Sequence, residues 1–172
     1  MYRLGTRPNM ASGAYAFRPM TAMDFEIIRR WLATPHVAQW WGDPREQFAL
    51  ISEDLDHPAM DQFIVSHSDR PFAYLQCYDP TAWPDNGLGK QPDGTRGIDQ
   101  FIGEEDMVDR GHGSALIRLF VDDLLKVGAS RTVTDPDPGN ARAIRAYEKA
   151  GFQKDRLVDT PDVCALLMVR DA

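Results

Sequence analysis

The sequence predicts an α/β fold, because short strand-forming runs alternate with amphipathic helical segments along the chain. In one such unit, a β-branched run at Thr132–Thr134 leads through a proline-containing turn into a helix that begins near Asn140. In another, a glycine-rich loop at Gly111 opens a long amphipathic helix. The chain has 172 residues, of which 43% are hydrophobic, enough for one domain with a substantial core. We therefore expect a single domain at residues 13–172 behind a loose tail at residues 1–12.

The first half of the chain predicts a strand, helices and a hairpin. Residues 14–18 alternate as in a strand, and a capping box of Thr21 and Asp24 then opens a helix. Asp43-Pro44 opens a second helix, because proline is favoured in the first helical turn. Between these helices we expect only a short, aromatic-rich connection at residues 35–41. The segments 62–67 and 72–78 then form the expected hairpin, around a turn at residues 69–70.

The second half predicts strands that alternate with helices. Residues 79–95 are rich in Pro, Gly, Asp and Asn and are expected to be irregular, and loops of this length are usually functional or mobile. A strand at residues 97–103, the glycine loop with its helix, and a strand near residues 131–134 follow. Asn140 suits the N-cap of the next helix, Gly151 suits its left-handed C-cap, and the last strand is expected at residues 163–169.

The loop Arg110-Gly-His-Gly-Ser114 has the chemistry of an anion site. Gly111 and Gly113 allow a ligand to approach the backbone, and the helix start supplies N–H groups and the positive end of a dipole. The loop lacks the third glycine of a dinucleotide fingerprint and the Gly-Lys-Ser/Thr of a P-loop. By itself, the pattern leaves open an ordinary loop before a helix.

Together, the two units resemble the GCN5-related N-acetyltransferases. More specific motifs, in chain order, are Trp40-Trp-Gly42, Arg96-Gly-Ile-Asp-Gln100, Thr134-Asp-Pro-Asp-Pro138, Arg142-Ala-Ile-Arg145, Tyr147-Glu-Lys-Ala-Gly-Phe152 and Thr160-Pro-Asp162. This combination is similar to the aminoglycoside 6′-N-acetyltransferases of the Ib type, over roughly residues 15 to 170, and is shared in part with siderophore-type lysine N-acyltransferases. The resemblance implies a mixed central β-sheet, splayed at the cofactor site, with helices on both faces. It also implies acetyl-CoA as co-substrate, without a metal, and direct attack by a primary amine in a ternary complex.

The resemblance implies two catalytic residues. Acetyl transfer requires a neutral amine, a nearby thioester carbonyl and a proton for the departing thiolate. Asp99 lies on the strand before the glycine loop and shares a face with Phe101. In the resembled family, the aspartate at this position contacts the acceptor amine and is the proposed general base. Tyr147 is the implied proton donor to the thiolate. A solvated aspartate at a strand end and a core tyrosine are the alternatives.

Further side chains are implied to hold the two substrates. Asp135 and Asp162 are acceptor-side carboxylates, although Asp135 also suits a plain turn before proline. Trp40 and Trp41 offer a wall for a sugar ring, or are ordinary core residues. Asn140 is the implied partner of the pantetheine arm, whereas a catalytic role for His112 is disfavoured. The implied cofactor-binding set is Phe101, Ile102, Val108, Arg110, Gly111, His112, Gly113, Ser114, Ala115, Asn140, Arg145 and Tyr147.

The sequence departs from the family pattern near the glycine loop. Val108 stands where many members carry Arg or Gln, and Glu104-Glu-Asp106 puts negative charges just before a phosphate site. We expect Arg110 and Arg118, with backbone N–H groups, to offset them. The segment 79–95 also differs from the resistance enzymes, which leaves the acceptor open.

Composition limits the partners. A formal charge of −7 and no basic patch argue against nucleic acid and suit a small cationic substrate. The sequence contains no apolar run of 18 residues, so it does not predict a membrane span. Its histidines are scattered and its two cysteines are far apart, which argues against a metal site and against a disulfide framework. We expect a cytoplasmic enzyme that is a monomer or weak homodimer. Acylation of a lysine-derived amine for siderophore assembly, and a non-catalytic CoA-binding module, remain the alternative functions.

Overall fold

The computed structural model describes residues 10–160 and 164–172. The described residues form two compact units, residues 10–77 with Gln100–Val108, and Tyr78–Asp99 with residues 109–160 and 164–172. The prediction of one domain at residues 13–172 stays a prediction. Among the described residues, no helix is both long and apolar enough to cross a membrane.

The strands of the first unit are β1 (Met10–Ser12), β2 (Tyr15–Pro19), β3 (Met60–His67) and β4 (Arg70–Tyr78). They follow one another in the order β1-β2-β3-β4, and β1–β2 and β2–β3 are antiparallel. The strand β1 corrects the predicted tail at residues 1–12, because residues 10–12 pair with β2. The β3–β4 turn also begins one residue earlier than predicted, with Ser68 and Asp69 at φ of 48° and 65°. Positive φ at both positions matches the twist of a two-residue hairpin.

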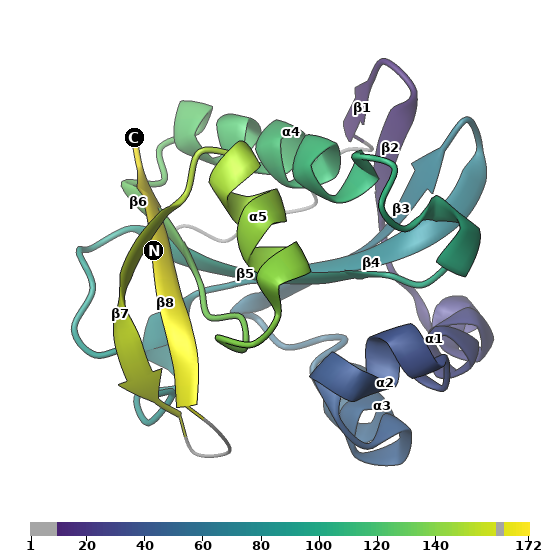
Figure 1. The fold of residues 1–172 in the computed structure, drawn as a ribbon, viewed down its shortest axis with the longest axis horizontal. Coiled ribbons are helices and arrows are strands. Elements are labelled where there is room, and N and C mark those ends of the chain that lie inside the picture. Colours follow the sequence, from purple (N-terminus) through teal and green to yellow (C-terminus); the bar gives the residue numbers. More distant parts are fainter. Residues whose placement is uncertain (1–9, 161–163) are drawn as a thin grey trace. The chain divides into compact units, whose positions relative to one another are not determined.

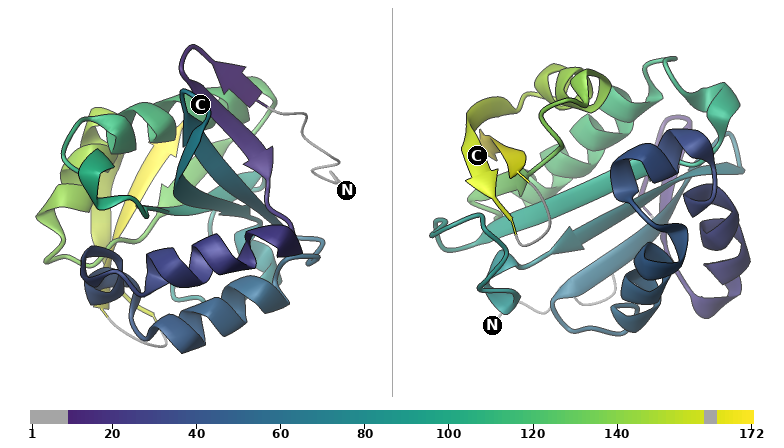
Figure 2. Two further views of the ribbon diagram at one scale, coloured as in Figure 1. Left: turned by 90° about the vertical axis from the view of Figure 1, so that its right-hand side faces the viewer. Right: turned by 60° about the horizontal axis from the view of Figure 1, so that its bottom comes forward.

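The helices of the first unit are α1 (Phe25–Leu32), α2 (Pro35–Trp41) and α3 (Pro44–Glu53). Figure 2 shows α1 and α3 side by side, and the two helices contact each other. The predicted capping box is confirmed, because Asp24 accepts from Thr21 N at 2.9 Å. The helix α3 starts at Pro44 as predicted, and the Asp43 side chain accepts from its first-turn N–H groups. The expected connection at residues 35–41 is wrong, because it forms α2. Proline at its first position and Gly42 at φ 90° after its end were the signals for a helix.

The core of the first unit is built around large aromatic side chains. Trp31 is fully buried, and its ring lies on Gly103, where an added Cβ would be 2.1 Å from the indole. Its Nε1 donates to Glu104 at 2.8 Å, so the buried indole N–H has a partner. The buried members of this cluster are Met20, Ile28, Trp31, Leu32, Val37, Ile51, Ile64, Tyr74 and Phe101.

The second unit contains residues 95–99 of the strand β5, whose full range is Thr95–Ile102. Its other strands are β6 (Arg131–Thr134), β7 (Gln153–Asp159) and β8 (Cys164–Asp171). They follow the order β5-β6-β8-β7, with β5–β6 parallel and the other pairs antiparallel. This arrangement confirms the predicted mixed sheet. The strand β7 was missing from the predicted order, because its residues are mostly exposed and lack the apolar alternation of a strand.

The helices of the second unit are α4 (His112–Lys126) and α5 (Ala141–Lys149), which contact each other (Figure 1). The predicted caps of α5 are present: Asn140 Oδ1 accepts from Ala143 N at 3.1 Å, and Gly151 has a φ of 97°. In the segment 79–95 the only helical turn described is Pro80–Ala82, in agreement with the irregular loop predicted there.

Candidate active site

The predicted site residues divide between the two units. The first unit holds Trp40, Trp41, Phe101, Ile102 and Val108. The second holds Asp99, Asp135, Arg110, Gly111, His112, Gly113, Ser114, Ala115, Asn140, Arg145 and Tyr147. Asp162 lies outside the described residues.

In the second unit, Asp99 lies on β5 and Asp135 follows directly after the end of the neighbouring strand β6. The last paired residues of β5 and β6 are Gly97 and Val133, and the same offset brings Asp99 opposite Asp135. Residues that face each other in this way lie on the same side of a sheet. The two carboxyl groups are close enough for the charge of Asp99 to act on Asp135. The predicted carboxylate pair is therefore brought together.

The carboxyl group of Asp135 is difficult to ionise. Burial away from water disfavours its charged form, and the negative charge of Asp99 adds to this effect. Together they raise the pKa of Asp135 to about 8. The pair therefore favours the binding of a proton or of another positive charge between its carboxyl groups.

The glycine loop has the geometry expected of an anion site. Gly111 is the N-cap of α4 at φ 82°, and an added Cβ there would meet no described atom within 4 Å. The N–H group of Ala115 donates to Gly111 O at 3.2 Å. The N–H groups that precede Ala115 in the first turn have no helical carbonyl acceptor, because the helix begins there. The open space above Gly111, the N–H groups and the exposed Arg110 fit the pyrophosphate that the family resemblance implies.

The acidic residues just before the loop are neutralised differently from the prediction. Glu104 accepts from Arg30 at 2.6 Å and from Arg70 at 3.2 Å, and Arg70 also pairs with Asp106 at 2.8 Å. These arginines, with the Trp31 indole, hold the pKa of Glu104 below its usual range despite its burial. Arg118 donates one guanidinium N–H to Lys149 O and keeps its charge, so its expected contribution near the loop stays a prediction.

Helix α5 supplies the residues predicted to meet the pantetheine arm and the thiolate. The carboxamide oxygen of Asn140 is used in the N-cap, which leaves the Nδ2 amide to serve as a donor. Tyr147 is 4% exposed, and its ring packs edge-on against Phe152 at 5.4 Å. Arg145 is exposed, and Arg142 pairs with Asp109 of the loop at 3.6 Å. Packing therefore fixes the Tyr147 ring, whereas its catalytic role stays a prediction.

In the first unit, the two tryptophans have different environments. Trp40 is 37% exposed, whereas Trp41 packs edge-on against Phe101 at 4.9 Å and Tyr74 at 6.0 Å. Trp41 thus packs against the core and is partly buried, whereas Trp40 is the more exposed ring, and the predicted sugar-binding role of both stays a prediction. The carbonyl of Ile102 accepts from His36 Nε2 at 2.9 Å, so it is already engaged. Val108 has an extended backbone after the turn Glu105–Met107.

One neighbour of the carboxylate pair was not predicted. The Tyr78 ring lies directly over Gly97, where an added Cβ would be 2.3 Å from its Cζ. Gly97 and Asp99 share a face of β5, so Tyr78 covers the strand one pleat before the carboxylate. The signal was the glycine itself, because a glycine inside a strand often marks close approach by another group.

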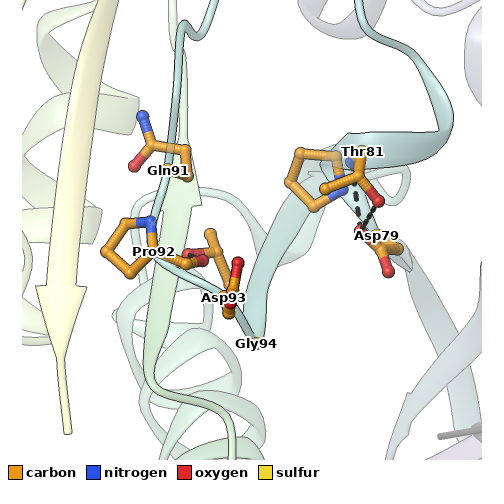
Figure 3. Close-up of a pocket in the computed structure, with 8 residues that line it drawn as sticks. Asp79, Thr81, Gln91, Pro92, Asp93 and Gly94 are labelled. Carbon is orange, nitrogen blue, oxygen red and sulfur yellow. Dashed lines mark hydrogen bonds between the residues drawn. The ribbon is translucent and has the colours of Figure 1, made fainter. Parts of the chain in front are cut away.

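A small pocket in the second unit lies at the start of β5, next to Gly94 and Thr95 (Figure 3). It has a volume of about 240 Å³ and is lined by Asp79, Pro80, Thr81, Gln91, Pro92, Asp93, Gly94 and Thr95. Asp79 accepts from the N–H and hydroxyl of Thr81, at 3.0 and 2.7 Å, and pairs with Arg96 at 3.3 Å. No predicted site residue lines this pocket. In the described part of the chain, no cluster of three or more His, Cys, Asp and Glu residues is placed to hold a metal ion.

Comparison with known proteins identifies a family for this fold and loop. The family model of the acetyltransferase (GNAT) domain matches residues 21–160. A protein of Klebsiella pneumoniae named aminoglycoside N(6')-acetyltransferase type 1 is 32% identical over 169 residues, covering 93% of this chain and 84% of the relative.

Solved structures give the same result. The aminoglycoside acetyltransferase AAC(6')-Ib in complex with coenzyme A and kanamycin has a TM-score of 0.79 and 32% identity, over 91% of this chain and 94% of that one. A complex of AAC(6')-Ib with paromomycin and acetyl-CoA has a TM-score of 0.81 and 30% identity, over 92% and 94%. The chain therefore belongs to the GNAT acetyltransferase family.

Proposed function

We propose that this chain is an acetyl-CoA-dependent N-acetyltransferase that modifies the 6′-amine of an aminoglycoside. The observation that carries the acceptor assignment is the Asp99–Asp135 pair, which favours the binding of a ligand that brings positive charge between its carboxyl groups. The net charge of −7 adds a long-range attraction for polycations. The similarity to an aminoglycoside N(6')-acetyltransferase over 93% of the chain supports the same acceptor class.

In this proposal, the glycine loop binds the phosphates of acetyl-CoA. Backbone N–H groups at the start of α4 and the exposed Arg110 provide positive potential. The Nδ2 amide of Asn140 donates to the pantetheine arm. Acetyl-CoA supplies the activated acetyl group as a thioester.

The carboxylates then prepare the amine. Asp135 holds the ammonium form by charge, and Asp99 accepts the proton that must leave before the nitrogen attacks. The new carbon–nitrogen bond forms as the carbon–sulfur bond breaks. The Tyr147 hydroxyl gives its proton to the departing thiolate and is reprotonated by the second proton that leaves the acetylated nitrogen, so that the products are a neutral amide and a thiol. The exposed ring of Trp40 is of the kind on which a sugar ring stacks.

We also infer that the enzyme acts in the cytoplasm, because its two cysteines, buried Cys77 and exposed Cys164, are both free. Unpaired cysteines are usual in a reducing compartment.

A screen of coenzyme A release with kanamycin, tobramycin and lysine as acceptors tests the proposed function. We expect turnover with both aminoglycosides and none with lysine. Turnover with lysine-type amines alone would replace the proposal with siderophore-type acylation. Tight acetyl-CoA binding without turnover of any amine would make the chain a CoA-binding module.

A further inference from the structure

The segment 79–95 is firmly anchored to the second unit, although it has almost no regular structure. Leu88 is 1% exposed and packs in a cluster with Val133, Val158, Ala165 and Leu167. Its carbonyl accepts from Arg156 Nη2 on β7 and from Gln91 Nε2, both at 2.9 Å. Its N–H donates to Asn86 Oδ1 at 2.9 Å. Leu88 is therefore fixed both by its side chain and by its backbone.

The adjacent glycine strengthens this attachment. Gly87 lies so close to the end of β7 that an added Cβ would be 2.5 Å from Asp159 O. Its φ of 79° also disfavours any other residue. The tip of the segment is thus held against β7 by a backbone contact that only glycine permits.

The cluster around Leu88 lies on the face of the sheet that carries the carboxylate pair. The antiparallel register of β6 and β8 pairs Thr134 with Met168, and Leu166 N donates to Pro136 O at 2.9 Å just beyond it. Asp135 is therefore opposite Leu167, and opposite residues of an antiparallel pair share a face. Val133 is two residues before Asp135 and shares the same face. Val133 and Leu167 belong to the same buried cluster as Leu88.

From this arrangement we propose that Leu88 is a positioning residue for the acceptor site. It holds the segment 79–95 over the sheet and keeps water from the apolar side of Asp135, so that the Asp99–Asp135 pair favours the binding of a proton or of an arriving ammonium group. The inference rests on the proposed function only in naming that ammonium group as the acceptor. It identifies a role for the irregular segment 79–95.

The electrostatic environment of Asp135 agrees with this role. Burial is the larger cause of its raised pKa, and the charge of Asp99 is the second. Other charged groups near this part of the unit have their own partners: Asp79 pairs with Arg96, Arg156 with Asp155, Arg170 with Asp122, and Asp171 with Arg131. Lys154 of β7 pairs with Glu148, and the other charged side chains described on these elements, which are Asp85, Lys90, Asp93, Asp137 and Asp159, are exposed. Removal of apolar cover is therefore the change that should act most strongly on Asp135.

The test is an NMR titration of the Asp135 carboxyl carbon in wild type, Leu88→Ala, Leu88→Val and the control Leu157→Ala. The signal is identified by its loss in Asp135→Asn. Leu157 is a leucine of β7 that is 62% exposed, so its truncation leaves the apolar cover intact. We expect the midpoint to fall from about 8 by one pH unit or more in Leu88→Ala, by less in Leu88→Val, and not at all in the control.

Kinetics provide a second readout. We expect the acceptor KM of Leu88→Ala to rise about tenfold, with acetyl-CoA affinity within twofold of wild type, because the change is confined to the acceptor side. If Leu88→Ala does not fold, Leu88→Val decides. A folded variant with the wild-type titration midpoint overturns the inference. Failure of the proposed function would instead appear as absent aminoglycoside turnover in the wild-type enzyme, with the titration result unaffected.

Discussion

Replacing Asp135 with asparagine should stabilise the protein at neutral and alkaline pH. The side chain keeps its shape but loses a charge that the fold disfavours. Folding raises the pKa of this carboxyl group from an ordinary value of 3.8 to about 8, so the folded state favours the protonated form. Wild type therefore carries no penalty below about pH 4, and loses stability progressively as pH rises from about 4 to about 8.

The magnitude follows from this difference in pKa. A change of about 4, at about 1.36 kcal/mol per pKa unit, gives an upper limit of about 5 kcal/mol at pH 8. Part of this arises from repulsion by Asp99, so Asp99→Asn should recover a smaller share. We expect Asp135→Asn to exceed wild type by about 2–5 kcal/mol at pH 8 and to equal it at pH 4.

Urea unfolding at pH 4, 6 and 8 measures this difference, because comparison of variant with wild type cancels the pH dependence of groups that do not interact with Asp135. Asp85→Asn is the matched control, since Asp85 is exposed in the same unit and should give no pH-dependent change. If the free energies of unfolding of Asp135→Asn and wild type differ by the same amount at every pH, burial and repulsion by Asp99 do not raise the pKa of Asp135, and the reasoning is refuted.

The remaining predictions concern catalysis and packing. Asp99→Asn should lower kcat/KM by about 10²-fold or more with unchanged acetyl-CoA affinity, and wild-type turnover would exclude Asp99 as base. Gly111→Val should weaken acetyl-CoA binding about tenfold in calorimetry, because valine disfavours φ 82° and fills the space above the loop, and unchanged affinity in a folded variant would remove the phosphate assignment. Gly97→Ala should cost about 1–3 kcal/mol in urea unfolding, because its Cβ meets the Tyr78 ring, and wild-type stability would contradict that contact.

Elements with a strong local pattern could be predicted from the sequence. The helix that begins at His112 has a wide apolar stripe, and it starts at the glycine loop that the sequence predicts. The caps at Asn140 and Gly151 follow from side-chain chemistry within a few residues. The predicted loop at residues 35–41 was wrong because its aromatic content obscured a proline helix start.

The remaining features depend on contacts distant in sequence. The strand β7 is stabilised by pairing with β8 rather than by its own residues, so its exposed side chains gave little signal. Glu104 is paired with Arg30 and Arg70, 74 and 34 residues away, which no local pattern reveals. The burial of Leu88 likewise depends on strands from the end of the chain. The pairing of Asp99 with Asp135, by contrast, follows from parallel strands of matching register.

The most direct measurement of the proposed reaction compares neomycin with paromomycin as acceptors. The two antibiotics share a scaffold and differ at the 6′ position, where neomycin has an amine and paromomycin a hydroxyl group. Acetyl-CoA consumption should be rapid with neomycin, should give a singly acetylated product modified at the 6′ nitrogen, and should be absent with paromomycin. Equal acetylation of both antibiotics would contradict transfer to the 6′-amine.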